Sequence, residues 1–450
     1  MVERGKETPS APSSGETVET KLQRIASKAR REPTLQFTSL FHLMDKELLR
    51  GCFQRLRGKA AAGIDRVTKA EYAKDLEANL EELIERLHRM GYRPQPVRRV
   101  YIPKPGSDKG RPLGITAVED KLVQMSLVKI LEQIYEQDFV EDSYGFRPGR
   151  GCHDALRALS RTVETGRINW IVEADIKGFF DNVSHEWLRK FIAHRVGDKR
   201  VQRMIVRFLK AGVMEEGWRY VSDEGVPQGG SISPILANVY LHYVLDLWFE
   251  RRFRQSCKGA ARMIRYADDY VACFEKEEEA RRFQAEMIER LAAFGLEGEP
   301  TKTKVLAFGP RAKQHAQEQG TSKPETFDFL GFTHYCSRSR NGKRFRMKRV
   351  TARKKFREKL ADFQQCLKEN RTLSTRELWE KVCAKLRGHF AYYGVTDNSP
   401  GIARFDYEAK RLLIKWLNRR GGKRRMNWEK FTLMESRFPL PKAQITVNLF

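Results

Sequence analysis

Apolar positions along the chain predict several amphipathic helices. Residues 68–90 form one helix in this interpretation, because Thr68 and Glu71 have the spacing of a capping box and apolar side chains then recur at helical intervals until Gly91. A second capping box, Thr116 with Glu119, predicts a helix that ends at about Phe139. Longer apolar patterns predict helices over 183–212, 231–255 and 276–294.

Other segments have the pattern of strands. Residues 92–114 contain five prolines and many basic groups, which favours extended strands joined by a turn. Trp170 to Ile176 is a short apolar run typical of a buried strand, and residues 263–274 are two short strands that meet at an acidic turn. The mixture of helices with separate strands predicts an α+β fold.

Both ends of the chain differ in composition from its middle. Residues 1–20 are rich in Ser, Thr, Glu, Pro and Gly, which predicts a disordered tail. Residues 337–360 carry twelve Lys or Arg and one acid, Glu358, and basic groups recur beyond residue 416. Aromatic residues lie between these basic groups, a combination that suits RNA, although each ring could equally belong to a core.

The net charge narrows the classes of partner. The chain has 85 Lys and Arg against 58 Asp and Glu, a formal net charge of +27. Nucleic acid is the usual polyanion for such an excess, with a membrane surface or an acidic protein as alternatives. The longest apolar runs are far shorter than the ~20 residues that span a bilayer, and no signal peptide is evident.

Metal binding, if present, should use carboxylates. The seven cysteines include no C-x-x-C pair, which argues for a reducing compartment and against a structural zinc site. The histidines are scattered and form no H-E-x-x-H motif. Carboxylates suit hard cations such as Mg²⁺.

Three acids are the candidates for such a site. Asp268 and Asp269 lie in the turn between two strands, where adjacent carboxylates repel each other unless a cation offsets them. Asp175 ends a buried strand, an expensive place for an unpaired charge. If the strands converge, the three acids could hold two Mg²⁺ ions about 4 Å apart. The alternatives are a solvated turn and a helix cap.

Other residues could surround a nucleotide. Lys104 and Arg111 could hold a triphosphate, and Gln228 lies in a glycine-rich loop that a nucleotide could approach. Lys302 could contact phosphate, and Phe180 could block a 2′-hydroxyl group. The lysines and the arginine could instead be solvated surface charges, the loop an ordinary turn, and Phe180 a core aromatic.

The order of the motifs resembles that of group II intron-encoded reverse transcriptases/maturases of the bacterial type. The blocks that carry the resemblance are GIDRVT (63–68), YIPKPGSDKGRPLGI (101–115), SYGFRPGRGCHDAL (143–156), EADIKGFFDNV (173–183), GVPQGGSISPILANVYLHYVLD (225–246), RYADDY (265–270), TKTK (301–304) and FDFLGF (327–332). Residues 386–394, LRGHFAYYG, are similar to the family's maturase signature.

The resemblance implies a right-hand polymerase with a palm that carries the three acids. Its expected divisions are a tail (1–20), fingers (21–160), palm (161–335), thumb or maturase domain (336–415) and a basic C-terminal segment (416–450). The metal ligands would be Asp175, Asp268, Asp269 and the backbone carbonyl of Ile176, and the nucleotide-binding residues would be Lys104, Arg111, Phe180, Gln228 and Lys302. RNA-binding residues are expected at Arg353, Lys354, Lys355, Arg424 and Arg425.

The implied activity is RNA-directed DNA synthesis with two Mg²⁺ ions, together with binding of the intron RNA to assist splicing and mobility. The expected partners are intron RNA, a DNA primer or target and deoxynucleoside triphosphates, with no membrane and with a homodimer as an option. The expected location is the bacterial cytoplasm, near the nucleoid. The family's C-terminal endonuclease is expected to be missing, because Cys383 is the last cysteine.

Two other interpretations stay open from the sequence. A domesticated or defence-associated reverse transcriptase would contain the same acids, although the maturase-like segment argues against a retron. A splicing factor that binds RNA without polymerising would keep the basic segments but lack activity.

Overall fold

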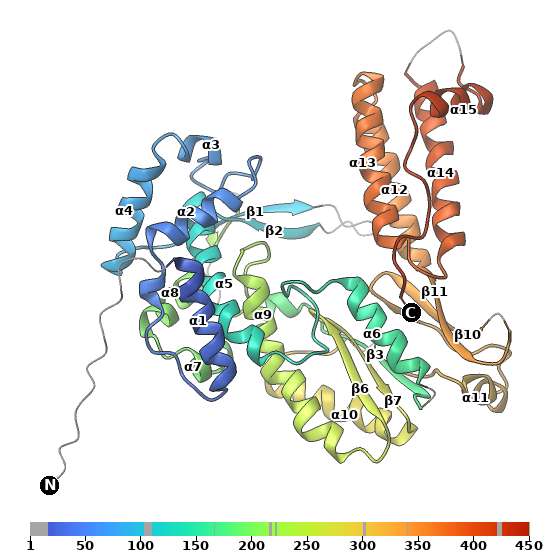
Figure 1. Cartoon of the computed structure of the whole chain (residues 1–450), viewed down its shortest axis with the longest axis horizontal. Helices are drawn as coiled ribbons and strands as arrows, with labels where there is room; N and C mark the ends of the chain where they lie inside the picture. Colours follow the sequence, from blue (N-terminus) through green and yellow to red (C-terminus); the bar gives the residue numbers. More distant parts are fainter. Residues whose placement is uncertain are drawn as a thin grey trace. The chain divides into compact units, whose positions relative to one another are not determined.

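The computed structural model describes residues 17–102, 110–165, 167–215, 218–220, 223–299, 303–339, 341–420 and 425–449, without the side chain of Arg111. These residues form two compact units (Figure 1). The first unit contains the described residues up to Val100, then Leu113–Phe139 and Val183–Tyr240. The second contains Val140–Asn182 and Leu241–Phe450, together with the short segment Tyr101–Pro112.

The first unit is mainly helical. Its helices are α1 (Val18–Arg31), α2 (Lys46–Arg55), α3 (Lys69–Tyr72), α4 (Leu76–His88), α5 (Val118–Asp138), α7 (His185–Arg195), α8 (Lys199–Leu209) and α9 (Ser233–Leu241). A small sheet has the strand order β2 (Arg111–Ile115), β1 (Val97–Ile102), β4 (Val213–Glu215) and β5 (Trp218–Tyr220).

The second unit is built on an antiparallel sheet with the strand order β6 (Ala261–Tyr266), β7 (Asp269–Phe274), β3 (Trp170–Asp175) and β8 (Lys304–Ala307). A second antiparallel sheet contains β9 (Phe327–Phe329), β10 (Phe332–Arg338) and β11 (Phe345–Thr351). The helices of the unit are α6 (Cys152–Glu164), α10 (Glu277–Ala293), α11 (Ala312–Glu318), α12 (Arg353–Glu369), α13 (Thr375–Tyr393), α14 (Ser399–Asn418) and α15 (Trp428–Arg437). The α+β prediction is confirmed by these elements.

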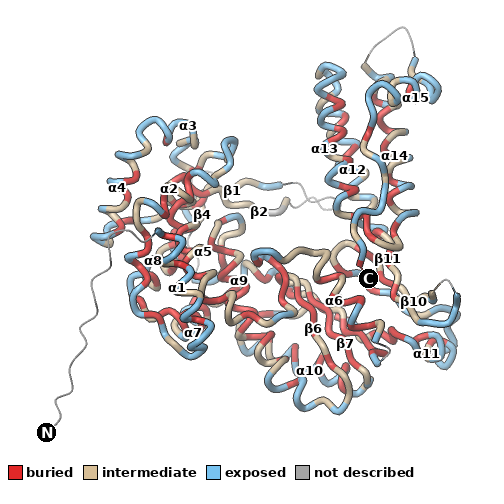
Figure 2. The backbone as a smooth tube through the Cα atoms, viewed as in Figure 1, coloured by how far each residue is buried: buried red, intermediate tan, exposed pale blue. Residues whose placement is uncertain are grey.

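The two faces of the β6-β7-β3-β8 sheet have different neighbours. Because side chains alternate along a strand, Tyr270 and Phe274 of β7 face α10, where the Tyr270 hydroxyl lies 3.0 Å from the Met287 sulfur and Phe274 packs on Phe283. Val271 belongs instead to a large apolar core shared with α6, the second sheet and α12–α14. Figure 2 shows this buried interior in red under an exposed surface.

One of the two capping boxes is confirmed. Thr68 and Glu71 form the expected reciprocal bonds, although the helix they open ends at Tyr72 and α4 begins anew at Leu76. The second is wrong: α5 has Ala117 at its N-cap, without a side-chain cap.

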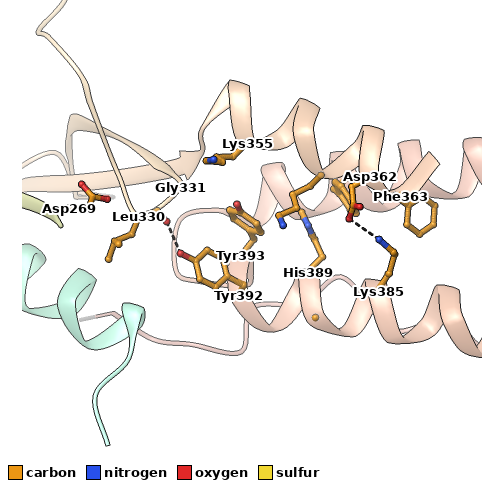
Figure 3. A pocket seen from close by; sticks show the side chains of 13 residues that line it. Asp269, Leu330, Gly331, Lys355, Asp362, Phe363, Lys385, His389, Tyr392 and Tyr393 are labelled. Atoms are coloured by element: carbon orange, nitrogen blue, oxygen red, sulfur yellow. Dashed lines mark hydrogen bonds and ion pairs between the residues drawn. The ribbon is translucent and has the colours of Figure 1, made fainter. Parts of the chain in front are cut away.

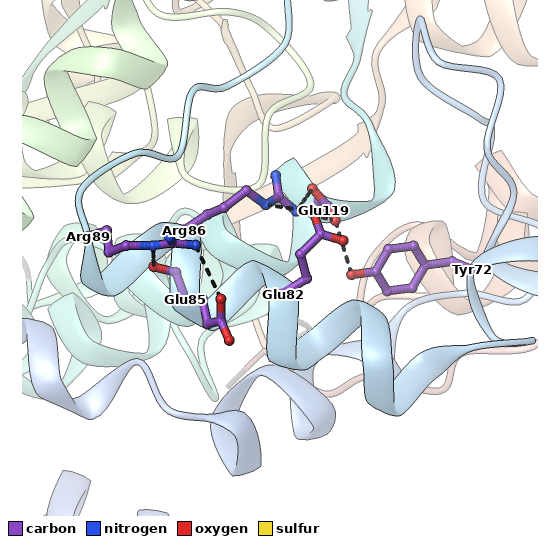
Figure 4. Close-up of polar contacts among 6 residues, drawn as sticks. All are labelled: Tyr72, Glu82, Glu85, Arg86, Arg89 and Glu119. Atoms are coloured by element: carbon purple, nitrogen blue, oxygen red, sulfur yellow. Dashed lines mark hydrogen bonds and ion pairs between the residues drawn. The ribbon is translucent and has the colours of Figure 1, made fainter.

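The carboxylate of Glu119 is engaged elsewhere in the first unit, which explains the missing capping box. Arg86 donates to both of its oxygens at 2.8 and 2.9 Å, and the Tyr72 hydroxyl donates to one of them (Figure 4). Two bonds from a charged guanidinium are stronger than one bond from a backbone amide, so the contact with Arg86 is favoured over a local cap.

The helix predicted over 183–212 is also wrong as a single element. It divides into α7 and α8, since Asp198 caps the second helix by accepting hydrogen bonds from the amides of Arg200 and Val201. The helix predicted over 231–255 is continuous but passes through π-helical turns at His242–Asp246 and Phe249–Phe253. The helix predicted over 276–294 and the strands predicted at 170–176 and 263–274 are confirmed.

Across the described part of the chain, we find no helix with the length and apolarity needed to traverse a bilayer.

Gly309 should be intolerant of a side chain. Its φ of +149° disfavours other residues, and an added Cβ would lie 2.0 Å from the Ile168 carbonyl oxygen. We expect Gly309→Ala to lower the thermal unfolding midpoint by about 5 °C or more. Gly342→Ala is the matched control, because Gly342 has a φ of +72° but open space around it. Equal effects of the two changes, measured by differential scanning calorimetry, would show that the close approach is unimportant.

Candidate active site

The strand register brings Asp175 beside Asp269. β3 and β7 are antiparallel, and Asp175 is the direct partner of Asp269 in their ladder. Side chains of directly opposed residues lie on the same face of a sheet, with their Cβ atoms about 4.5–5.5 Å apart. Two acids that are 94 residues apart in the sequence are therefore neighbours, as the sequence analysis predicts.

Asp268 lies on the tight turn between β6 and β7. Tyr266 and Asp269 are the last paired residues of this hairpin, so Ala267 and Asp268 form its turn. Ala267 has a φ of +58°, a left-handed conformation that two-residue hairpin turns require and that is costly for a residue with a side chain. The turn therefore places Asp268 directly before Asp269 at the end of the sheet.

The charges of these acids are strongly coupled. Burial, followed by the charges of Asp175, Asp268 and Glu173, raises the pKa of the Asp269 carboxyl to about 7. The backbone amide of Leu330 donates a hydrogen bond to Asp269 and opposes the rise in its pKa. A carboxyl that resists ionisation next to three other acids is a position where a cation would be stabilising.

The residues fit a hard divalent cation by their chemistry. The donor set is carboxylate oxygen only, and the coupling between the acids is the repulsion that Mg²⁺ would relieve. Within the described ranges, however, no group of three or more acid, histidine or cysteine side chains is arranged to hold a metal ion.

Two predicted residues lie just beyond Asp175. Ile176 has a buried side chain, and its backbone forms a bridge with Gly298 that uses the Asp175 carbonyl and the Lys177 amide. That bridge does not use the Ile176 carbonyl, whose role as a metal ligand stays a prediction. Phe180 lies half-buried in a short 3₁₀ helix, with its ring edge-on to Phe179, and its contact with a nucleotide also stays a prediction.

The other predicted nucleotide-binding residues are not brought together by the described structure. Lys104 and Lys302 lie outside the described residues, and Arg111 is described only as the first backbone position of β2. Gln228 belongs to the first unit, where its backbone carbonyl accepts a 2.6 Å hydrogen bond from the Gly114 amide. These four assignments stay predictions.

A cleft of about 620 Å³ extends from Asp269 along the helices of the second unit (Figure 3). Its walls come from the Leu330-Gly331 turn, α12, α13 and α14. Lysines 355, 359 and 385 line it, and among the described residues Lys355 pairs with Glu358 and Lys385 pairs with Asp362. Lys359 was not among the residues predicted from the sequence, although it follows Lys355 by one helical turn.

The basic segments divide into structural and exposed groups. Arg353, Lys354 and Lys355 are exposed in the first turn of α12, and Arg425 is exposed before α15, whereas Arg424 lies outside the described residues. Two cations of the 337–360 run are structural instead: Arg349 is fully buried and donates to Ser160, and Arg346 pairs with Glu164. Charge density in the sequence therefore overstates the surface free to bind a polyanion.

His389 is a neutral, buried group in the wall of the cleft. Its ring stacks on Phe405 at 3.5 Å between centroids, and its Nε2 atom has no hydrogen-bond partner among the described residues. Burial, together with the nearby charge of Lys359, lowers the pKa of His389 to about 4. The imidazole thus adds an uncharged polar atom to a cationic cleft.

This shift in pKa predicts a specific acid sensitivity. The unfolded chain binds a proton at His389 near pH 6.5, whereas the folded chain does so only near pH 4, so stability is lost as the pH falls through this window. Between pH 7 and pH 5, the native protein should lose about 2 kcal/mol more stability than His389→Gln. Thermal unfolding at both pH values measures the difference.

The control for this prediction is His88→Gln, since the His88 side chain is exposed. This variant should follow the native protein at both pH values. If His389→Gln loses as much stability as the native protein, the imidazole is not held neutral in the fold.

Comparison with known proteins agrees with this geometry. The family model described as reverse transcriptase (RNA-dependent DNA polymerase) matches residues 102–334, which include β3, β6, β7 and all three acids. The chain belongs to the reverse transcriptase family. Its relatives include a group II intron-encoded protein and an intron maturase, the kinds of protein that the motifs resemble.

Three relatives illustrate the range of the family. The group II intron-encoded protein LtrA of Lactococcus lactis subsp. cremoris is 40% identical over 234 residues, which are 50% of this chain and 38% of LtrA. Protein YkfC of Escherichia coli (strain K12) is 34% identical over 281 residues, or 55% of this chain and 74% of YkfC. Nuclear intron maturase 2, mitochondrial, of Arabidopsis thaliana is 36% identical over 90 residues, covering 20% of this chain and 12% of that protein.

Proposed function

We propose that this chain is an RNA-directed DNA polymerase that also binds a group II intron RNA and assists its splicing and mobility. The observation that carries the proposal is the pairing of Asp175 with Asp269 at the end of β3 and β7, beside Asp268 on the turn. Membership of the reverse transcriptase family supports the reaction class. The names of the relatives support the intron as the source of RNA.

The three acids would hold two Mg²⁺ ions in the proposed mechanism. When bound, such ions supply positive charge that favours ionisation of a primer 3′-hydroxyl and stabilises the leaving pyrophosphate. The protein contributes fixed geometry: β3 and β7 hold Asp175 and Asp269 in register, and the Leu330 amide donates a hydrogen bond to Asp269. Rigid strands suit this role because charge stabilisation depends on preorganised groups.

The cleft that begins at Asp269 supports a nucleic-acid strand as the ligand of the second unit. Lys355 and Lys359 are one helical turn apart on α12 and both line the cleft, a spacing that suits consecutive contacts with phosphates. Gly388, also in the lining, has open space where a side chain would project, which leaves room for a close approach of a sugar-phosphate backbone. We propose that α12–α14 act as the thumb and the β6-β7-β3-β8 sheet as the palm of a right-hand polymerase.

The polymerase activity is directly testable. Purified protein with Mg²⁺, a poly(rA) template and an oligo(dT) primer should incorporate dTTP, and Asp268→Ala should reduce incorporation at least about 10³-fold because a metal-binding carboxylate is lost. Asp75→Ala is a matched control, because Asp75 is exposed and forms no side-chain cap at α4. The control should retain the activity of the native chain.

The same assay separates the competing functions. Strong incorporation by Asp268→Ala would contradict the assignment of the acids. If the native protein incorporates no dTTP but still binds intron RNA, the chain is a binding protein that assists splicing without polymerising.

The role of the cleft predicts a change in salt dependence. Lys355→Ser with Lys359→Ser should reduce the slope of log affinity for primer–template against log salt by about 2, since each phosphate contact releases nearly one counterion. Lys313→Ser with Lys323→Ser is the control, because both lysines are exposed outside the cleft lining. Fluorescence anisotropy at several salt concentrations measures both slopes, and equal slopes would exclude the cleft as the phosphate-binding site.

A further inference from the structure

Arg265 is a fully buried charge next to the acidic turn. Its side chain is 1% exposed, and that of its partner Asp246 is 0% exposed. The guanidinium donates to both Asp246 oxygens, from Nε at 2.7 Å and from Nη2 at 2.5 Å. Asp246 comes from the first π-helical turn after α9, so the pair joins strand β6 to a helix. Burial of both charges is costly, and such a pair is retained for stability only when its geometry is excellent.

The same guanidinium also donates to a serine hydroxyl and to one backbone carbonyl of the turn. Nη2 donates to the Ser143 hydroxyl at 2.8 Å, and Nη1 donates to the Ala267 carbonyl at 2.9 Å. The Ala267 carbonyl belongs to the peptide group that joins Ala267 to Asp268, so this bond fixes the plane of that peptide. Ala267 has the left-handed conformation that the turn needs, which must be stabilised from outside because a side chain disfavours it.

Residues 142–145, which precede α6, also contact β6 and the turn. The Arg265 amide donates to the Asp142 carbonyl, and the Tyr144 amide donates to the Arg265 carbonyl, each at 2.9 Å. A Cβ on Gly145 would lie 2.2 Å from the Ala267 nitrogen, so only glycine allows the segment to pack against the turn. The turn is therefore held on this side by the segment of residues 142–145.

We infer that Arg265 is a positioning residue that fixes the Ala267–Asp268 peptide and thereby aims the two turn carboxylates at the site they share with Asp175. Only arginine can do this, because its planar fork donates in several directions at once, whereas a lysine at this depth cannot reach all three acceptors together. This inference rests on the proposed polymerase function for its catalytic consequence. Its structural half, the ordering of the turn, is independent of that function.

Arg262 provides an internal comparison on the same strand. It forms a bidentate pair with Asp142 at 2.6 and 2.7 Å, so its charge pairing resembles that of Arg265. Its hydrogen bonds go to the Asp142 side chain and not to the turn. Replacing each arginine with lysine therefore separates loss of a bidentate pair from loss of the contact with Ala267.

The experiment compares Arg265→Lys, Arg262→Lys and the native chain by two readouts. Hydrogen exchange of a peptide that covers residues 263–274 reports the order of the turn without metal or nucleic acid. Steady-state dTTP incorporation gives kcat, KM and the Mg²⁺ concentration for half-maximal rate.

For Arg265→Lys we expect about 10-fold faster exchange at the turn, a kcat lower by about 10- to 100-fold, a several-fold higher Mg²⁺ midpoint and an unchanged affinity for primer–template. Arg262→Lys should stay within about twofold of the native chain in every quantity. Unchanged exchange and an unchanged Mg²⁺ midpoint in Arg265→Lys would overturn the inference, even if its melting temperature fell.

A double variant tests whether the pair serves only stability. Arg265→Met with Asp246→Leu removes both buried charges, and apolar replacement of such a pair can leave a protein equally stable. We expect it to fold but to show the fast exchange and the weak Mg²⁺ response of Arg265→Lys. A folded double variant with the exchange rate and Mg²⁺ midpoint of the native chain would overturn the inference. If the double variant does not fold, the test rests on Arg265→Lys.

If the native chain incorporates no dTTP, the proposed function is wrong, but the exchange rates still test the role of Arg265 in ordering the turn.

Discussion

The repulsion between carboxylates at one end of the β6-β7-β3-β8 sheet is the constraint on which the rest of the second unit depends. Asp175 and Asp269 are opposed in the ladder, and Asp268 follows on the turn. Their mutual repulsion contributes to a pKa for Asp269 of about 7. A rigid backbone keeps these carboxylates together, and either a proton on Asp269 or a bound cation relieves their repulsion.

The backbone and the carboxylates at this end of the sheet are held by residues that are far apart in the sequence. The Leu330 amide, from the turn between β9 and β10, donates to Asp269, and Arg265 holds the Ala267 carbonyl. The two faces of the sheet are both covered, by α10 on one side and by α6 and the large core on the other. The free end of the sheet opens onto a cleft lined with lysines. An anionic strand beside the acids would thus meet compensating positive charge.

The local elements and the three acids could be predicted from the sequence. Contacts between residues far apart in the chain, which override local patterns, could not. Apolar periodicity located β3, β6, β7 and α10, and the motif order indicated that distant acids would meet. The Thr116 capping box failed because Arg86, a residue of another helix, binds Glu119. The helix expected over 183–212 failed because Asp198 begins a new helix by capping it. Arg349 belongs to the basic run 337–360 but is buried against Ser160, and only packing distinguishes it from the exposed cations of that run.

Electron paramagnetic resonance of bound Mn²⁺ tests the central claim most directly. With a primer that lacks a 3′-hydroxyl, an RNA template and dTTP, the account predicts two Mn²⁺ ions per chain that are close enough for their spins to couple. Asp175→Asn should abolish the coupling, although this residue is far in sequence from the turn. Two uncoupled ions, or coupling that survives in Asp175→Asn, would contradict a shared metal site between β3 and the β6–β7 turn.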